Sequence, residues 1–182
     1  MNLTEADFMA ALHGYIAEIT GMDGNRIFQG NQSRMVLPKS GPFCIYTPIL
    51  RQRRGTNIYK FDAVGKPDDE NGIDTMTALV LVDVQIDFYG EGAMLNAQSV
   101  EMASRSYLGT DYFKKSDVDV RVSTADTPKN LTGVDASNQY ETRWTVTVTA
   151  EVNPALTNDL PWIEDFTFKA IKNVDVYFPP TE

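Results

Sequence analysis

The stretch T-A-L-V-L-V-D-V-Q-I-D-F-Y-G, residues 77–90, is the longest strand-like run in the sequence. From residue 80 onward apolar and polar side chains alternate, and this period of two predicts a strand with one buried face. The apolar side is formed by Val82, Val84, Ile86 and Phe88, and the polar side by Asp83, Gln85, Asp87 and Tyr89. Glycines end the strand, and the apolar residues of 93–108, up to Tyr107 and Leu108, then recur at helical spacing. The centre of the fold is therefore predicted as a strand, a turn and a helix.

Another helix is predicted near the N-terminus. Thr4 is placed to cap it, with Asp7 at the position that completes a capping box. One apolar face of this helix is formed by Phe8, Leu12, Tyr15, Ile16 and Ile19. The helix is expected to end near Gly21, because glycine commonly terminates helices.

An exposed hairpin is predicted over residues 43–64. Residues 43–50 and 57–64 both alternate as strands and are separated by a short polar segment. Pro48 cannot donate a ladder hydrogen bond, so the first strand is expected to lie at a sheet edge or to bulge there. The tip of the hairpin is basic and carries Arg51, Arg53 and Arg54.

Further strands complete the predicted sheet. Residues 118–122 and 139–152 alternate in the same way, and one or two more strands are expected within 166–178. The polar segments between the strands are predicted as loops at 65–74, 124–137 and 153–161. This order of elements predicts an α+β fold with a mainly antiparallel sheet flanked by two helices. We expect residues 1–182 to form a single domain.

Composition narrows the classes of function. The 182 residues carry a formal net charge of −9, so the surface as a whole is not expected to hold nucleic-acid phosphates. The single cysteine, Cys44, excludes an intramolecular disulfide and is expected to be a buried thiol. No apolar run is long enough to cross a membrane, and the N-terminus is acidic where a signal peptide is basic. A soluble intracellular product without membrane contact is therefore expected.

No catalytic, metal or cofactor motif is complete in this sequence. Residues 78–88 resemble the opening strand of isochorismatase-like and nicotinamidase-like cysteine hydrolases, and Asp83 then stands where the aspartate helps to activate a cysteine. In that family the nucleophile follows this strand at a distance, whereas Cys44 precedes it and no cysteine comes after. Asp83 and Asp87 share a strand face at a separation of about 13 Å, which is too far for one metal ion. We therefore expect no catalytic residue, no metal and no cofactor.

Five short motifs lie along the chain in a particular order. They are N-Q-S-R-M-V-L-P at 31–38, F-C-I-Y-T-P-I at 43–49, R-R-G-T-N at 53–57, V-Q-I-D-F-Y-G at 84–90 and Q-Y-E-T-R-W at 139–144. Taken together and in this order, they resemble the neck or tail terminator proteins of long-tailed phages and prophages. The segment D-F-T-F-K-A-I-K-N-V-D, at 165–175, resembles the closing segment of that family. The resemblance covers most of the chain.

The resemblance implies a structural virion protein of the tail or neck, assembled in the host cytoplasm. A ring, with six subunits, would cap the head-proximal end of the tail tube, end its polymerisation and join the tail to the head-neck connector. The implied partners are other copies of the chain, the tail tube protein, the sheath where the tail is contractile, and the neck or head-completion connector. DNA would meet the ring only transiently, in its lumen, and a net acidic ring would let it slide.

Interfaces are predicted at the basic tip and within the family-like stretches. The candidate interface residues are Arg51, Arg53, Arg54, Gln85, Asp87, Gln139 and Arg143. Asp87 and Arg143 are expected to pair across strands, while Phe88 and Trp144 are expected in the core. Two related roles stay open: a different connector adaptor, and the cap of a contractile-injection tube. The cysteine hydrolase is a remote third.

Overall fold

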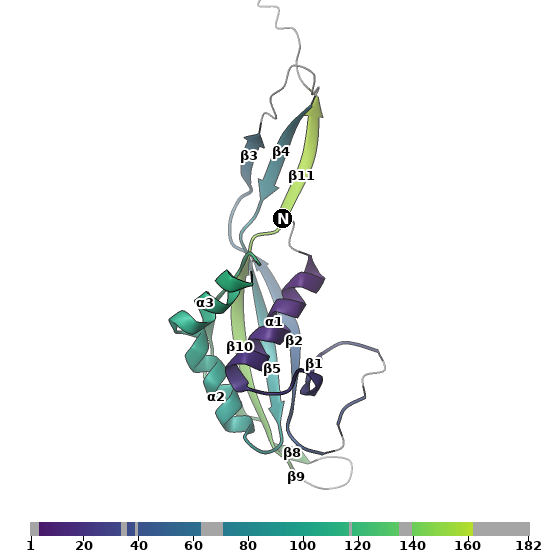
Figure 1. Ribbon diagram of the computed structural model, residues 1–182, viewed down its shortest axis with the longest axis vertical. Helices are drawn as coiled ribbons and strands as arrows, with labels where there is room; N and C mark the ends of the chain where they lie inside the picture. Colours follow the sequence, from purple (N-terminus) through teal and green to yellow (C-terminus); the bar gives the residue numbers. More distant parts are fainter. Residues whose placement is uncertain are drawn as a thin grey trace, which may run out of the picture.

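The computed structural model describes residues 4–33, 36–38, 40–62, 71–116, 118–134 and 140–161. Figure 1 shows a body in which helices pack on a sheet, and a narrow arm of strands that projects from one end of the body. The elements are α1 (Glu5–Thr20), the 3-10 helix η1 (Gly24–Arg26), β1 (Ile27–Gln29), β2 (Phe43–Arg53), β3 (Ile58–Asp62), β4 (Asn71–Thr77), β5 (Val80–Tyr89), α2 (Ala93–Ser104), α3 (Tyr107–Lys115), β6 (Val120–Ala125), β7 (Lys129–Asn130), β8 (Gly133–Val134), β9 (Tyr140–Glu141), β10 (Arg143–Val152) and β11 (Ala155–Pro161). The strands predicted within 166–178 lie outside the described residues.

The body is built on one sheet, with the strand order β1-β2-β5-β10-β6 and with β7 paired to β10. β1 runs parallel to β2, and the other pairs in this sheet are antiparallel. The predicted central strand is β5, which pairs with β2 on one side and with β10 on the other. The predicted α+β class with a mainly antiparallel sheet is confirmed.

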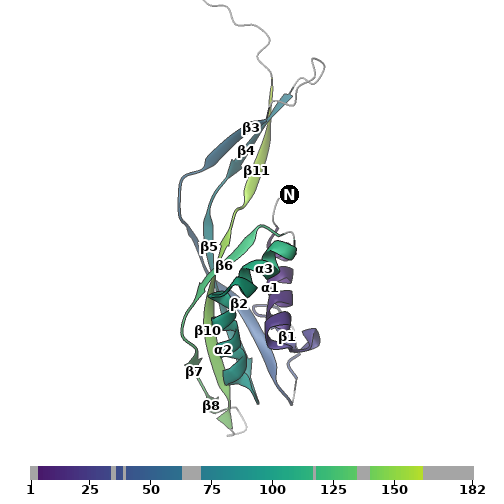
Figure 2. The same ribbon diagram turned by 60° about the vertical axis from the view of Figure 1, so that its left-hand side comes forward.

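Figure 2 shows α1, α2 and α3 on one face of this sheet, and no described helix lies on the other, open face. On the covered face alternate strand residues are buried, as the period of two predicts. They include Val82, Val84, Ile86, Phe88, Val146, Val148 and Ala150, and Trp144 packs against them half-buried. The helices add Leu12, Tyr15, Ile16, Ala97, Val100 and Phe113 to the same core. Because burial of each large apolar side chain contributes about 1.5–3 kcal/mol, this one core stabilises the whole body.

The first helix begins and ends where its sequence predicts. The Thr4 hydroxyl accepts a hydrogen bond from the Asp7 N–H at 3.1 Å, and the Asp7 carboxylate accepts one from the Thr4 N–H at 3.1 Å. These two bonds complete the predicted capping box. Gly21 ends the helix with φ at 68°, a left-handed conformation that favours glycine.

The helix predicted over 93–108 is in fact two helices, so three helices rather than two flank the sheet. The Ser106 side chain causes the break, because its hydroxyl donates to a carbonyl of the last α2 turn at 2.9 Å and accepts from the Leu108 N–H at 3.2 Å. Serine in this position caps a new helix instead of continuing the old one. Tyr107 and Leu108, which were predicted to share the apolar stripe of one helix, are therefore 77% and 47% exposed.

The arm is a separate sheet with the strand order β11-β4-β3. It continues the three central strands of the body, because β2 leads into β3, β4 leads into β5, and β10 leads into β11 (Figure 1). The hairpin predicted over 43–64 is therefore wrong. β2 pairs with β5 and β3 pairs with β4, so residues 54–57 carry the chain onward into the arm instead of turning it back.

Some segments predicted as loops are strands. β4 begins inside the predicted loop 65–74, and β11 occupies most of the predicted loop 153–161. Within 124–137 the structure places the short strands β7 and β8. The β4 and β11 sequences, N-G-I-D-T-M-T and A-L-T-N-D-L-P, lack a clear period of two. Neither face of the arm is covered by the described part of the chain, so no buried face imposes that period.

Candidate assembly surfaces

Asp87 is the centre of a hydrogen-bonded network on the open face of the sheet. Its carboxylate accepts a hydrogen bond from Arg143 Nε at 3.2 Å and forms an ion pair with Arg143 Nη2 at 3.0 Å. It also accepts bonds from Gln85 Nε2 at 2.9 Å and from the Thr145 hydroxyl. The strand register explains this gathering, since Thr145 lies directly opposite Asp87 and Arg143 lies one diagonal step away. The predicted pairing of Asp87 with Arg143 is confirmed.

Arg143 is also held by an aromatic pair. The rings of Phe43 and Tyr89 are stacked, with centroids 4.5 Å apart and an angle of 6° between their planes. The guanidinium carbon of Arg143 lies 5.7 Å from the centroid of the Tyr89 ring, which is a cation–π distance. Burial raises the pKa of Tyr89, and the Arg143 charge opposes this shift. The guanidinium thus contacts a carboxylate and an aromatic face at once.

This network ties β5 to β10 within one chain. The Asp87 side chain is only 7% exposed and the Arg143 side chain 34% exposed. The oxygens of Asp87 are therefore taken up by partners within the chain. Contact of Gln85 or Arg143 with another subunit stays a prediction, and Gln139 lies outside the described residues.

The three predicted arginines lie where the body joins the arm. Arg51 and Arg53 end β2, and Arg54 follows at once. Arg53 donates to the Gly55 carbonyl at 2.7 Å and to the Asn57 side chain, so it fixes the connection that leads to β3. The Arg54 backbone N–H bonds to the connection between β4 and β5 at 3.0 Å. The cluster is a basic site in an acidic protein, and its contact with a partner stays a prediction.

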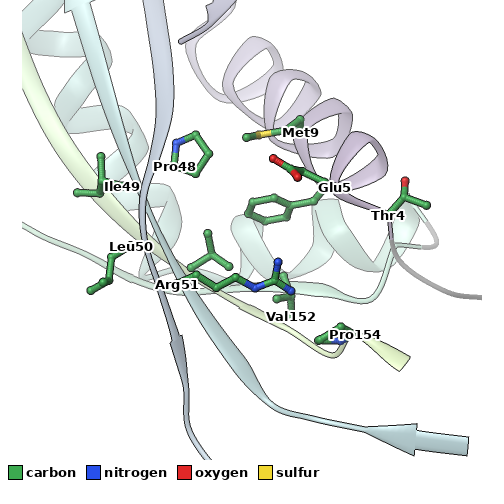
Figure 3. Close-up of a pocket in the computed structure, with 11 residues that line it drawn as sticks. Thr4, Glu5, Met9, Pro48, Ile49, Leu50, Arg51, Val152 and Pro154 are labelled. Atoms are coloured by element: carbon green, nitrogen blue, oxygen red, sulfur yellow. The ribbon is translucent and has the colours of Figure 1, made fainter. Parts of the chain in front are cut away.

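Arg51 lines a cavity of about 330 Å³ between β2 and the first turn of α1. The β2–β5 register shifts between Pro48 and Leu50, which confirms the bulge predicted at the proline. In Figure 3, Pro48 and Arg51 point toward α1, whereas Ile49 and Leu50 point to the other side of the strand. Apart from Arg51, the lining combines the polar start of α1 with apolar side chains, among them Phe8, Met9, Val82 and Val152. We interpret this cavity as a packing gap at the base of the arm.

One face of the arm carries large apolar side chains, with the polar Asp74 and Asn158 in the row of Phe61. Residues opposite one another across the arm strands share a face, and one such row consists of Tyr59, Met76 and Leu156. Phe61 lies on the same face, where a Cβ on Gly72 would come within 2.5 Å of its ring. Tyr59, Phe61 and Leu156 are 64%, 56% and 62% exposed. We call Tyr59, Phe61, Met76 and Leu156 the arm face.

A second set of exposed apolar side chains lies on the helices. Leu95 and Met102 are two turns apart on one side of α2, and each is 61% exposed. Met94 on α2 and Tyr107 and Leu108 at the start of α3 are also exposed, at 47%, 77% and 47%. We call Met94, Leu95, Met102, Tyr107 and Leu108 the helix stripe. Sequence reasoning missed it because the break at Ser106 turns Tyr107 and Leu108 outward.

The residues of the cysteine-hydrolase alternative do not meet. Cys44 faces the core opposite Phe88, whereas Asp83 lies on the open face, about 17 Å from Phe88 along β5. Burial raises the pKa of the Cys44 thiol well above its usual value, and the nearby Asp87 charge adds to this effect. Asp83 accepts a hydrogen bond from the Thr149 hydroxyl at 2.7 Å instead. The two residues therefore cannot act together as nucleophile and activating acid.

Comparison with known proteins assigns the chain to a family. A family model described as phage neck terminator protein matches residues 6–176, a range that contains the body, the arm, the arm face and the helix stripe. No curated protein matches the chain. In the described part of the chain, no three His, Cys, Asp or Glu side chains gather as metal ligands would. None of the described helices combines the length and apolar character that a membrane crossing requires.

Proposed function

We propose a function on the premise that the chain belongs to the phage neck terminator family, since the family match spans residues 6–176 of the 182. As a member of this family it is a structural protein of the phage neck or tail. Our proposal is that six copies form a closed ring on the head-proximal end of the tail tube. The ring ends tube polymerisation and joins the tail to the head-neck connector, and the genome passes through its lumen.

The distribution of exposed apolar side chains supports a ring. A closed ring of identical subunits needs two different contact surfaces on each subunit. This chain exposes two apolar surfaces of different kinds, the arm face on strands and the helix stripe on helices. The arm also projects beyond the body, so that one subunit can reach a neighbour (Figure 1).

The charge of the chain supports a passage for DNA. Protein cations that neutralise phosphates hold DNA in place, and each such contact adds to its affinity. With a net charge of −9, acidic side chains outnumber basic ones in each subunit, so we expect few cations to face the lumen. We propose that the exception, the cluster of Arg51, Arg53 and Arg54, meets an acidic surface of a neighbouring subunit or of the tube.

The capping role is tested on growing tubes. Purified chain added to polymerising tail tube protein should stop elongation at amounts far below one chain per tube subunit, because only tube ends are bound. Deletion of the gene should give tails of uncontrolled length or tails without heads. Tails of normal length joined to heads in its absence would contradict the proposal. Light scattering across a wide concentration range then tests for a species of six times the 20.3 kDa chain mass.

A further inference from the structure

The helix layer of the body ends where the arm begins, but the sheet face that it covers continues. Met76 lies an even number of residues before Val80, and Leu156 an even number after Val152. The pairing register is unchanged from Val80 opposite Val152 to Met76 opposite Leu156, so Met76 and Leu156 continue the face on which Val80 and Val152 are buried. The arm face is thus the helix-facing side of the sheet, and no described helix covers it (Figure 2).

We propose that the helix stripe of a neighbouring copy packs on the arm face and supplies the helix layer that the arm lacks. This inference rests on the proposed function, since the contact repeats head to tail around the ring. Each subunit offers its arm face to one neighbour and its helix stripe to the other. The contact joins two different surfaces, as ring closure requires.

The chemistry of the two surfaces is complementary. The arm face presents the rings of Tyr59 and Phe61, and the helix stripe presents the thioethers of Met94 and Met102. Methionine side chains adapt their shape and make favourable contacts with aromatic rings. A helix laid on a sheet face is also the arrangement that this chain already uses for its own core.

The exposed area is sufficient for a specific contact. A large side chain such as these buries about 150–250 Å² when it is fully covered. Since Tyr59, Phe61 and Leu156 are each more than half exposed, they offer roughly 350 Å² of apolar surface. That value matches the largest apolar patch of a typical monomer, about 300–600 Å², which is often functional. With its polar rim, such a patch can form the core of an interface of about 800 Å² per partner.

Sedimentation of paired variants tests this inference. The arm variant carries Tyr59→Ser and Leu156→Ser, and the helix variant carries Leu95→Ser and Met102→Ser. A control variant carries Leu131→Ser, which removes a 49% exposed apolar side chain just after β7, outside both surfaces. Circular dichroism and urea unfolding of each variant verify that it is folded, as expected for exposed positions.

The wild-type chain and the control should form the same large species. Each of the other two variants alone should stay monomeric, with association weakened by about 100-fold or more. An equimolar mixture of these two should form a complex of twice the chain mass and nothing larger, because only one intact arm face meets one intact helix stripe.

Three outcomes would overturn the inference. In the first, the arm and helix variants assemble as the wild type does, which leaves the ring intact but places its contacts elsewhere. In the second, the helix variant alone still forms dimers, which indicates contact between two arms. In the third, every protein including the wild type stays monomeric at millimolar concentration, as expected if the arm face is covered within its own chain. The capping assay on tail tubes decides separately whether the proposed function holds.

Discussion

Replacement of Arg143 by methionine should destabilise the body strongly, because it leaves the Asp87 carboxylate buried without its counter-ion. The Asp87 side chain is 7% exposed and loses one charged hydrogen bond at 3.2 Å and one ion-pair contact at 3.0 Å. Breaking a fully buried pair in this way costs about 3–5 kcal/mol. Thr145 and Gln85 still donate to the carboxylate, and water reaches the site through the 34% exposed Arg143 position. We therefore expect a loss of about 2–3 kcal/mol.

Urea unfolding measures this loss. With a slope of about 2 kcal/mol per molar urea, the midpoint should fall by about 1–1.5 M. Arg121→Met is the matched control, since Arg121 is exposed on the neighbouring strand β6, and it should shift stability by less than about 0.5 kcal/mol. The double variant with Asp87→Asn should lose about 1–2 kcal/mol less than the sum of the single variants. Additive effects, or an Arg143→Met variant as stable as the control, would refute a buried ion pair as the tie between β5 and β10.

Three further predictions concern a turn, a thiol and a helix cap. In urea unfolding, Gly90→Ala should cost about 2–3 kcal/mol of stability and Gly92→Ala only about 1 kcal/mol. Both glycines have positive φ, 82° and 77°, but only at Gly90 would the new methyl group lie 3.2 Å from a backbone atom. Equal losses of stability would contradict this. Burial raises the pKa of the Cys44 thiol. The buried neutral thiol therefore contributes its full stability below the pKa of the unfolded thiol, about 8.5, and this stability is lost as pH rises above that value, by up to about 1.4 kcal/mol per pH unit. The midpoint of Cys44→Ala should therefore fall less between pH 8 and 10 than that of the wild type, and parallel curves would argue against the shift. Thr4→Ala should lower Tm by about 2–4 °C. The Thr4 hydroxyl and N–H lower the pKa of Asp7, so this difference should shrink as Asp7 is protonated below pH 4, while the bond from the Asp7 N–H to the hydroxyl remains. A difference of the same size at pH 2 and pH 7 would speak against the capping box.

The sequence predicted those elements whose pattern is imposed by a buried face or by a local cap. β5 was recognisable because its even-numbered residues are buried under the helices, and α1 because Thr4, Asp7 and Gly21 mark its two ends. The pairing of Asp87 with Arg143 was predictable because both residues lie on the polar faces of strands that were predicted from their alternation, β5 and β10.

The arm was not predictable in the same way. Its strands have no covered face in the described chain, so their side chains are free of the alternation that reveals a strand. The polar residues 54–57 resemble a turn, and only the pairing of β2 with β5 and of β3 with β4 shows that they connect two sheets. The helix stripe was hidden for a local reason, since a hydroxyl at Ser106 decides whether Tyr107 faces inward or outward.

The junction between body and arm has a mechanical consequence. The ladder between β5 and β10 ends at Val80 and Val152, and the ladder between β4 and β11 resumes at Thr77 and Ala155. Across the junction two backbone bonds remain, from the Ala78 N–H to the Pro154 carbonyl at 3.3 Å and from the Arg54 N–H to the Leu79 carbonyl at 3.0 Å. Because these two bonds hold the junction in place of full ladders, we expect the arm to swing about it as a lever. Tension applied to the arm tip by the neighbouring structures would then change the angle of the lever and leave the packed body undistorted.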